Sequence, residues 1–315
     1  HVWEAAESTL GAEQASLYWR IAPPCLSFDS ADEAEYAISM YTLMKRYNVA
    51  TTYAGLCLSQ GLELDTGVVD KALQGLCPSE GRTEPSEYYL SIACSYLDAE
   101  HPTEALAWKE FAWLPLLRNA GAPRNNSNLY LLRLMSQSPE FFMTILSLLY
   151  SKKSGEDNED RARIAKERAF EVLHAWRVVP GSTENGIDHD ELDNWLKRVS
   201  ELASNAGLVD QAKHAIGRCF LHAPADPGSL FIDRKIAKHL DQDECMLNGY
   251  FEEAVNSQGA IWVGEHGEAF FKIAREFDAK ATELEHTGFM QFAAALRNLA
   301  REYEADGKRE CEEHR

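Results

Sequence analysis

The sequence predicts an all-α fold in which antiparallel helix hairpins stack into an α-solenoid. Apolar residues recur at helical spacing along most of the chain, and no region shows the sustained apolar–polar alternation of a half-buried strand. A helix-turn-helix pattern of large and small side chains also occurs at residues 193–224 and again at 86–117. Because stacked hairpins nest large side chains against small ones at fixed offsets, this repeated pattern favours a solenoid.

Polar segments divide the chain into three helical blocks, at residues 1–150, 160–224 and 230–315. The run at 151–160 is charged and free of large apolar residues, which indicates a boundary or a loop. Shorter loops are expected at 180–188 and 224–229. The three blocks are compatible with one continuous domain, and we expect the stacking to be irregular in the middle and C-terminal parts.

The hairpin pattern in the first block lies at residues 86–117, after a helix start signal. Thr83 is followed by Glu84 and Pro85, as in a capped helix with proline in its first turn. The side chains expected to pack against neighbouring helices are Tyr89, Ile92, Ala93, Tyr96, Ala105 and Ala112. A fainter copy of the pattern spans residues 53–76.

The clearest copy of the hairpin pattern lies at residues 193–224. Gly207 marks the turn between its two helices, where a glycine is favoured. The expected packing positions are Leu196, Val199, Ser200 and Ala203 before the turn, and Ala212, Ile216, Cys219, Phe220 and Pro224 after it.

Three further apolar stripes predict helices outside the two hairpins. They consist of Ala165, Ala169, Val172, Leu173 and Trp176; of Phe270, Ala274, Phe277, Ala281 and Leu284; and of Phe289, Phe292, Ala293, Leu296, Leu299, Ala300 and Tyr303. Asp241 followed by Glu244 resembles a capping box. It predicts a helix start between the hairpin pattern of residues 193–224 and the stripe that begins at Phe270.

The charge balance excludes some classes of partner. The 31 basic and 50 acidic residues leave a net charge of −19. Nucleic acids and anionic lipids are bound by clustered Lys and Arg, so we expect neither as a partner.

No apolar run reaches the roughly 18 residues of a membrane span. The 7 cysteines are scattered without a C-x-x-C pair, which is typical of buried thiols in a reducing compartment. We therefore expect a cytoplasmic protein.

The spacing within residues 86–117 and 193–224 resembles the tetratricopeptide family. This resemblance implies repeats of two antiparallel helices, and in the members that bind peptides the first helix of each repeat lines a concave groove. The matching positions are Glu87, Leu90, Cys94 and Leu97 in one repeat, and Asn194, Lys197, Glu201, Ser204 and Asn205 in the other. The first set lacks the basic and asparagine residues that clamp a C-terminal carboxylate in some members, so the resemblance implies an apolar or mixed ligand surface.

Residues 111–116, 138–142 and 256–259 resemble part of the C-terminal helical region of large multidomain bacterial proteins, some of them associated with defence or signalling. This second resemblance implies a sensor or scaffold segment joined to flanking domains of a longer chain. The start at His1, without an initiator Met, agrees with that expectation.

The densest group of potential metal ligands is Asp188, His189, Asp190 and Glu191. Acidic residues at a helix start complement the helix dipole, and consecutive side chains point to different sides. We therefore expect a helix cap and no metal. The residues Glu265, His266 and Glu268 lack the second histidine of the H-E-x-x-H metalloprotease pattern, so a solvated helix start is expected there as well.

Cys219 with His214 or His222 is the one candidate for thiol catalysis. However, Cys219 occupies a packing position and is expected to be buried, while His214 lies about 140° away around the helix. The chain also lacks the glycine-rich phosphate loops and the G-x-S-x-G elbow. We therefore predict no catalytic residue and no cofactor.

These observations favour a non-catalytic scaffold that binds a protein or a peptide on a solenoid surface. Trp262 lies in a loop beside Gly259, and it is the tryptophan that we expect to be exposed and to contribute to binding. Two alternatives stay open. One is a sensor or regulatory segment of a larger bacterial protein, and the other is a helical enzyme that uses scattered carboxylates or histidines.

Overall fold

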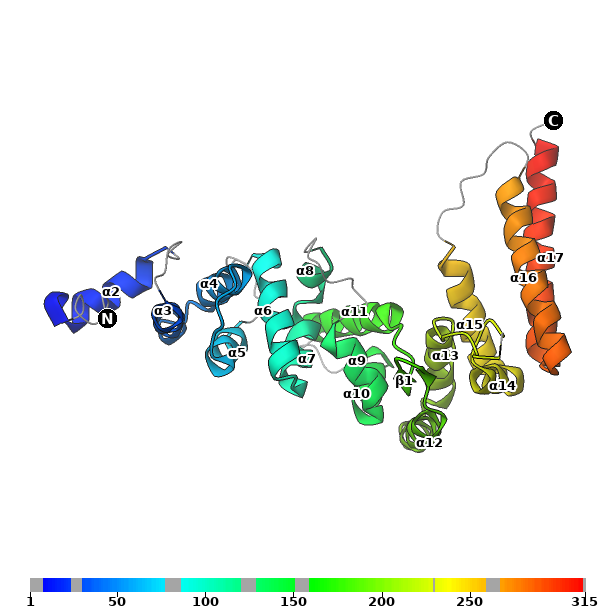
Figure 1. Cartoon of the computed structure of the whole chain (residues 1–315), viewed down its shortest axis with the longest axis horizontal. Coiled ribbons are helices and arrows are strands. Elements are labelled where there is room, and N and C mark those ends of the chain that lie inside the picture. Colours follow the sequence, from blue (N-terminus) through cyan, green and yellow to red (C-terminus); the bar gives the residue numbers. More distant parts are fainter. Residues whose placement is uncertain are drawn as a thin grey trace. The chain divides into compact units, whose positions relative to one another are not determined.

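The computed structural model describes residues 8–23, 30–76, 86–119, 129–150, 159–228, 230–258 and 267–313. Regular structure in these ranges is helical, apart from a small antiparallel hairpin of β1 (Ser182–Thr183) and β2 (Gly186–Ile187) (Figure 1). The prediction of an all-α fold is therefore confirmed. Within the described residues, no helix combines the length and the apolar character needed to cross a membrane.

The chain forms two compact units, of which the first comprises His1–Leu134 and Glu167–Ala175, and the second Met135–Lys166 and Trp176–Arg315. The helices of the first unit are α2 (Ala12–Ile21), α3 (Ala31–Leu43), α4 (Tyr47–Ser59), α5 (Thr66–Gln74), α6 (Glu87–Glu100), α7 (Glu104–Ala112) and α8 (Leu114–Asn119). Helices α9 (Tyr130–Gln137) and α11 (Glu159–Ala175) contribute residues to both units. In the first unit, α4 packs against α3, α5 and α6, and α6 packs against α7 and α8.

Helices α4 and α6 approach each other closely because Gly55 lies at their contact. A Cβ atom at this position would overlap the backbone oxygen of Tyr89. Polar groups in the same unit are also satisfied by side chains, since the fully buried Glu110 accepts a hydrogen bond from the backbone N–H of Leu131 at 2.7 Å. The first unit thus has its own core, and close packing of α4 against α6 is part of it.

The predicted packing face of residues 86–117 is rotated from the observed one. In α6 the buried apolar side chains are Leu90, Ala93, Cys94 and Leu97, whereas Tyr89, Ile92 and Tyr96 are half-buried. In α7 the core contains Leu106 and Phe111, Ala105 is exposed and Ala112 is half-buried. The reason is that α6 carries large apolar residues on nearly all sides, so its sequence does not select one face. The predicted cap at Thr83 lies outside the described residues.

The helices of the second unit are α10 (Pro139–Tyr150), α12 (His189–Ala206), α13 (Val209–Phe220), α14 (Arg234–Gln242), α15 (Glu244–Asn256), α16 (Glu268–Thr287) and α17 (Met290–Glu313). Phe142, Trp176 and Trp195 form an aromatic cluster in its core, with ring centroids 5.0 to 5.9 Å apart. The indole N–H of Trp176 donates to the hydroxyl of Ser136 at 2.8 Å. Trp176, which belongs to a predicted apolar stripe, and Trp195 are both buried.

The second hairpin pattern is confirmed in α13 and corrected in α12. Ala212, Ile216, Cys219 and Phe220 of α13 are buried, and Gly207 ends α12 in the left-handed conformation with a φ of 68°. The buried face of α12 consists of Leu192, Trp195, Val199 and Ala203. Leu196 is therefore only half-buried and Ser200 is exposed, because Trp195 provides more apolar surface to bury than Leu196 and turns the helix toward itself.

Helix α13 packs closely on α15 through a pair of glycines. A Cβ atom at Gly217 would overlap the backbone oxygen of Met246, and one at Gly249 would overlap that of His214. Each glycine therefore lies against the backbone of the opposite helix. This crossing brings side chains of α13 and α15 together deep in the second unit.

The C-terminal stripes are confirmed in α16 and α17, which lie side by side as an antiparallel hairpin (Figure 1). Apart from the partly exposed Phe270 and Phe289, the predicted residues of both stripes are buried. The predicted cap at Asp241 is corrected. Asp243 caps α15 by accepting the N–H of Met246, and Asp241 accepts the N–H of Phe292 at 2.9 Å. Asp241 therefore ties the end of α14 to the start of α17.

Candidate partner-binding surfaces

The five positions predicted on the second hairpin form an exposed polar stripe along α12. Asn194, Lys197, Glu201, Ser204 and Asn205 are all exposed, and their spacing places them opposite the buried face of the same helix. We call this set the α12 stripe. It combines one cation, one carboxylate and three neutral polar groups.

Neighbouring polar side chains hold the α12 stripe in place. Arg198 donates from Nε to Glu140 Oε1 of α10 at 2.7 Å and from Nη1 to Glu201 Oε2 at 3.2 Å. The hydrogen bond from Arg198 lowers the pKa of Glu140 below its ordinary value. Ser204 Oγ donates to the backbone oxygen of Ser200 at 2.7 Å. The stripe is therefore presented by a helix that is anchored to α10.

The four positions predicted on the first hairpin do not form a surface. Leu90, Cys94 and Leu97 are at most 3% exposed, and Glu87 is half-buried. Side chains buried to this degree present no area to a partner, which corrects the prediction for those three positions. Trp262, the remaining predicted contact residue, lies outside the described residues, as do Glu265 and His266.

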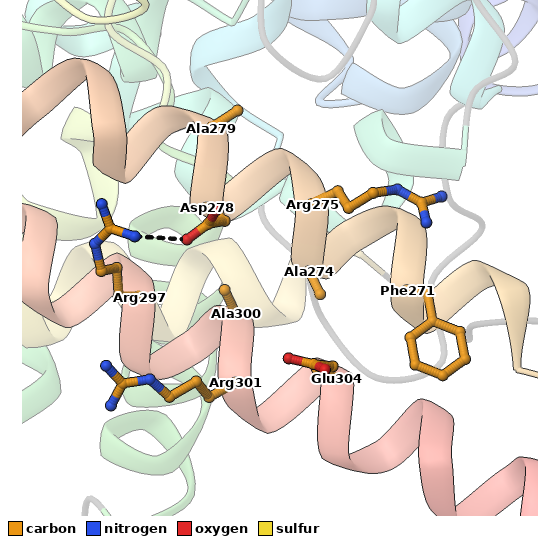
Figure 2. A pocket seen from close by; sticks show the side chains of 9 residues that line it. All are labelled: Phe271, Ala274, Arg275, Asp278, Ala279, Arg297, Ala300, Arg301 and Glu304. Atoms are coloured by element: carbon orange, nitrogen blue, oxygen red, sulfur yellow. Dashed lines mark hydrogen bonds and ion pairs between the residues drawn. The ribbon is translucent and has the colours of Figure 1, made fainter.

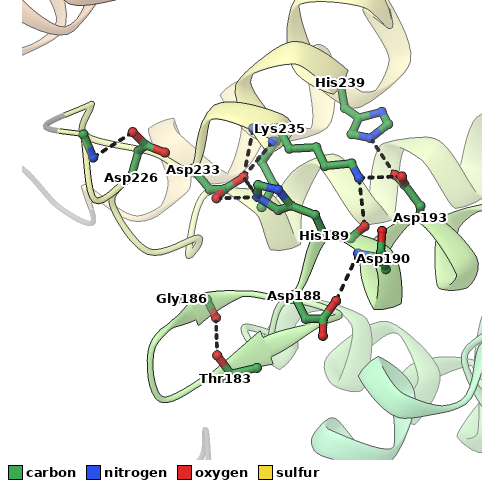
Figure 3. A network of polar contacts seen from close by, with 12 residues as sticks. Thr183, Gly186, Asp188, His189, Asp190, Asp193, Asp226, Asp233, Lys235 and His239 are labelled. Atoms are coloured by element: carbon green, nitrogen blue, oxygen red, sulfur yellow. Dashed lines mark hydrogen bonds and ion pairs between the residues drawn. The ribbon is translucent and has the colours of Figure 1, made fainter.

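The acidic cluster at the start of α12 takes part in a network of polar contacts (Figure 3). Asp188 Oδ1 accepts the N–H groups of Asp190 and Glu191, both at 3.0 Å, so it caps α12 as predicted. His189 Nε2 lies 3.0 Å from Oδ2 of the buried Asp233, which itself caps α14. Within the residues that the structure describes, no group of three or more metal-ligating side chains is assembled.

Lys235 extends this network back to α12. Its Nζ donates to the backbone oxygen of His189 at 2.8 Å and forms an ion pair with Asp193. His239 lies on the other side of Asp193, with 3.9 Å between Nε2 and Oδ1. These contacts connect the first turn of α12 with α14, and they give the cluster a structural role.

Cys219 is not placed as a nucleophile. Its side chain is fully buried, and Sγ donates to the backbone oxygen of Val178 at 3.3 Å. Burial raises the pKa of this thiol well above its ordinary value, so the reactive thiolate is suppressed. His214 Nε2 instead lies 3.2 Å from Glu252 Oε2, and His222 Nε2 lies 3.7 Å from Glu253 Oε1.

A buried ion pair, which sequence reasoning missed, crosses the contact of α13 with α15. Arg218 donates from Nη2 to Glu253 Oε2 at 2.5 Å and from Nε to the same oxygen at 3.2 Å. Both side chains are less than a tenth exposed. The pair lies beside the close crossing at Gly217, so it orients one helix relative to the other.

A shallow groove of about 450 Å³ runs between α16 and α17 (Figure 2). Its floor contains the small side chains of Ala274 and Ala300, and Phe271 lies at one end. The groove is also lined by Arg275, Asp278, Ala279, Arg297, Arg301 and Glu304. We call it the C-terminal groove. Sequence reasoning missed it because the groove depends on how α16 and α17 pair in space, and the alanines of an apolar stripe indicate only core residues.

The charges in the C-terminal groove differ in how they are compensated. Arg297 pairs with Asp278 at 2.9 Å and with Glu285 at 2.6 Å, and its hydrogen bond to Glu285 lowers the pKa of that carboxyl group. Glu304 pairs with Lys308 at 2.8 Å.

Arg275 and Arg301 are the uncompensated cations of the C-terminal groove. Among the described residues, neither forms an ion pair with a carboxylate, and Arg301 donates to Asn298 Oδ1 at 3.3 Å. The groove therefore presents two cationic groups above an apolar floor.

Comparisons with known proteins add no relative to this description. No protein-family model, no curated protein and no solved structure matches the chain. The two resemblances drawn from the sequence therefore stay predictions.

Proposed function

We propose that this protein is a non-catalytic helical scaffold of the α-solenoid type that binds a protein or peptide partner on the α12 stripe. The observation that carries the proposal is the stripe itself, five exposed side chains of mixed polarity on one face of an 18-residue helix. Helix faces of this kind are suited to recognise another chain by hydrogen bonds and ion pairs along their length.

The rigidity of α12 supports this proposal. Asp188 caps its first turn, Gly207 ends it, and Leu192, Trp195 and Val199 hold its opposite face in the core. Side chains on an element that is already ordered lose less conformational entropy when a partner binds. Lys197 and Asn205 therefore occupy positions that are fixed at the backbone and adaptable at the side chain.

The order of helix contacts supports the solenoid part of the proposal. In the first unit α4 packs on α6, and α6 packs on α8, so alternate helices are neighbours. In the second unit α10 packs on α12, the first helix of the hairpin at residues 193–224, and α13, its second helix, packs on α15. Alternate packing is what a stack of helix hairpins requires, because the first helices of successive hairpins contact each other and so do the second helices.

The test removes the side chains of the α12 stripe and measures partner recovery. The variant carries Lys197→Ala, Glu201→Ala and Asn205→Ala in the full chain, and the control carries Lys238→Ala, Glu276→Ala and Gln291→Ala, which are exposed in the same unit. Partners crosslinked to the wild-type chain in its native extract are quantified by mass spectrometry. We expect recovery to fall at least about tenfold with the first variant only, since loss of a few central contacts typically costs this much affinity. Equal recovery from both variants would rule out the α12 stripe as the binding surface.

A further inference from the structure

We propose that the C-terminal groove binds an amphipathic helix from a partner protein, one with a narrow apolar face flanked by Asp or Glu side chains. The inference rests on the proposed function only in taking the ligand to be a protein. It concerns a different surface, formed by α16 and α17, and is argued from shape and charge.

The shape of the groove fits a helix. Two antiparallel helices leave a furrow along their contact, and a third helix can lie in it as in a three-helix bundle. Here the floor is made of Ala274 and Ala300, so the backbone of the incoming helix can come close. A volume of about 450 Å³ accommodates a few aliphatic side chains and is far smaller than a folded domain would fill.

The charges define the flanks of the incoming helix. Arg275 lies on α16 and Arg301 on α17, so there is a cation on each of the two helices that border the groove. Figure 2 shows their guanidinium groups pointing away from each other, so they do not converge on a single small anion. Two carboxylates on either side of a helix can pair with them separately, and arginine favours such planar carboxylate contacts.

The same charges disfavour a polyanion with closely spaced phosphates. Asp278 and Glu304 also line the groove, and the chain as a whole carries a net charge of −19. A phosphate backbone would be repelled by both. A helical peptide avoids this repulsion because it can place carboxylates at Arg275 and Arg301 alone, while Asp278 and Glu304 stay paired with Arg297 and Lys308.

The probe is a fluorescein-labelled designed peptide of 18 residues with leucine and alanine at i, i+3, i+4 and i+7 and glutamate beside them. Three comparison probes are a peptide with each glutamate replaced by lysine, an acidic peptide of the same composition without the apolar stripe, and a labelled single-stranded oligonucleotide of equal length. Binding to the full 315-residue chain is measured by fluorescence anisotropy. We expect the acidic amphipathic peptide to bind at least about tenfold more tightly than the other three probes.

Substitutions that reverse the charge of the two arginines or fill the groove test whether the peptide binds there. The double variant Arg275→Glu with Arg301→Glu is expected to bind the acidic peptide at least about tenfold more weakly than the wild type. It should bind the lysine peptide more tightly, because both contacts change sign. The control pair, Arg161→Glu with Arg234→Glu, makes the same change in net charge at exposed positions on other helices. Ala279→Trp, at an exposed position of the lining, is expected to block the peptide while leaving the circular dichroism spectrum unchanged.

The inference fails if the lysine peptide binds wild-type protein as well as the acidic peptide does, or if both arginine pairs have the same effect. Tighter binding of the oligonucleotide, or of the acidic peptide without a stripe, would also overturn it. Concentration-dependent self-association that is lost in Ala279→Trp would assign the groove to a second copy of this chain instead. None of these outcomes depends on the α12 stripe, so failure here and failure of the proposed function are distinguishable.

Discussion

Arg218 and Glu253 show how a single pair of side chains can determine the packing of two helices. Their charges are removed from water between α13 and α15, where an ion pair has to compensate for its lost hydration. Such a pair contributes more to the uniqueness of the packing than to its free energy, because an apolar pair of similar size would avoid the cost of desolvation. Loss of Glu253 is different, since it leaves the buried Arg218 with only the more distant carboxylate of Glu252, whose Oε1 lies 3.6 Å from Nη1.

Replacement of Glu253 by leucine therefore should lower the free energy of unfolding by about 3 kcal/mol. The double variant Arg218→Met with Glu253→Leu should recover most of that loss, because no buried charge remains. Urea denaturation followed by circular dichroism measures both effects. A double variant that is as unstable as the sum of the two single variants would show that the charges do not act as a pair.

His222 makes the stability of the second unit depend on pH. Burial, and next the positive charge of Arg177, lower the pKa of His222 below its ordinary value of 6.5. Below pH 6.5 the unfolded chain then binds a proton that the folded chain does not, so folding loses free energy as the pH falls. Above that pH both states are neutral at this residue, and the contribution is constant.

We expect the melting temperature of wild-type protein to fall between pH 7.5 and pH 5.0, a range chosen above the titration of most carboxylates. His222→Gln should show a smaller fall, because glutamine does not titrate. His239, whose pKa burial also lowers, retains part of the effect. If the melting temperatures of the variant and the wild type fall by the same amount, His222 does not contribute to the pH dependence of stability.

At the scale of the element, the helices differ in how far their sequences determine their orientation. In α17 the apolar residues fall on one stripe, so the buried face could be predicted residue by residue. In α6 apolar side chains surround the helix, and the neighbouring helices decide which of them are buried. The exposure of the α12 stripe could be predicted because its polar residues lie opposite the apolar face of the same helix. The C-terminal groove could not, since it depends on how α16 and α17 pair in space.

The start of α12 offers a test at this scale. Asp188→Ala should lower the free energy of unfolding by about 1 kcal/mol, because two N–H groups lose their acceptor. Asp188→Ser should restore most of the loss, since serine is also a good N-cap residue. Thermal unfolding of the three proteins in the presence of a chelator measures both effects. Equal stability of the alanine and serine variants would show that capping is not the role of this carboxylate.

At the scale of the whole molecule, the two units have separate cores that depend on separate glycines. Gly55 permits the contact of α4 with α6 in the first unit, and Gly217 permits that of α13 with α15 in the second. The chain as a whole carries a net charge of −19, whereas the C-terminal groove contains two arginines that form no ion pair among the described residues. Binding specificity can therefore reside in local charges that oppose the net charge of the chain.

Substitution of either glycine should destabilise mainly the unit that contains it. In Gly217→Ala the added methyl group meets backbone, so α13 or α15 must shift, and we expect a loss of about 1 to 3 kcal/mol. Hydrogen exchange should then accelerate in α13 and α15, and Gly55→Ala should instead accelerate it in α4 and α6. Gly67→Ala is the control, because its methyl group would meet only the side-chain oxygen of Asp65. Uniform acceleration across both units in either variant would contradict this assignment.

The position of Cys219 has a practical consequence. Its sulfur lies beneath the backbone oxygen of Val178 in the second unit, whereas Cys57 and Cys94 are buried in the first. An alkylating reagent can reach these atoms only when the surrounding helices separate, so the rate at which each one is modified measures how often its own unit opens. Each unit therefore contains its own native cysteine probe of opening, whose modification can be followed by mass spectrometry without introducing a substitution.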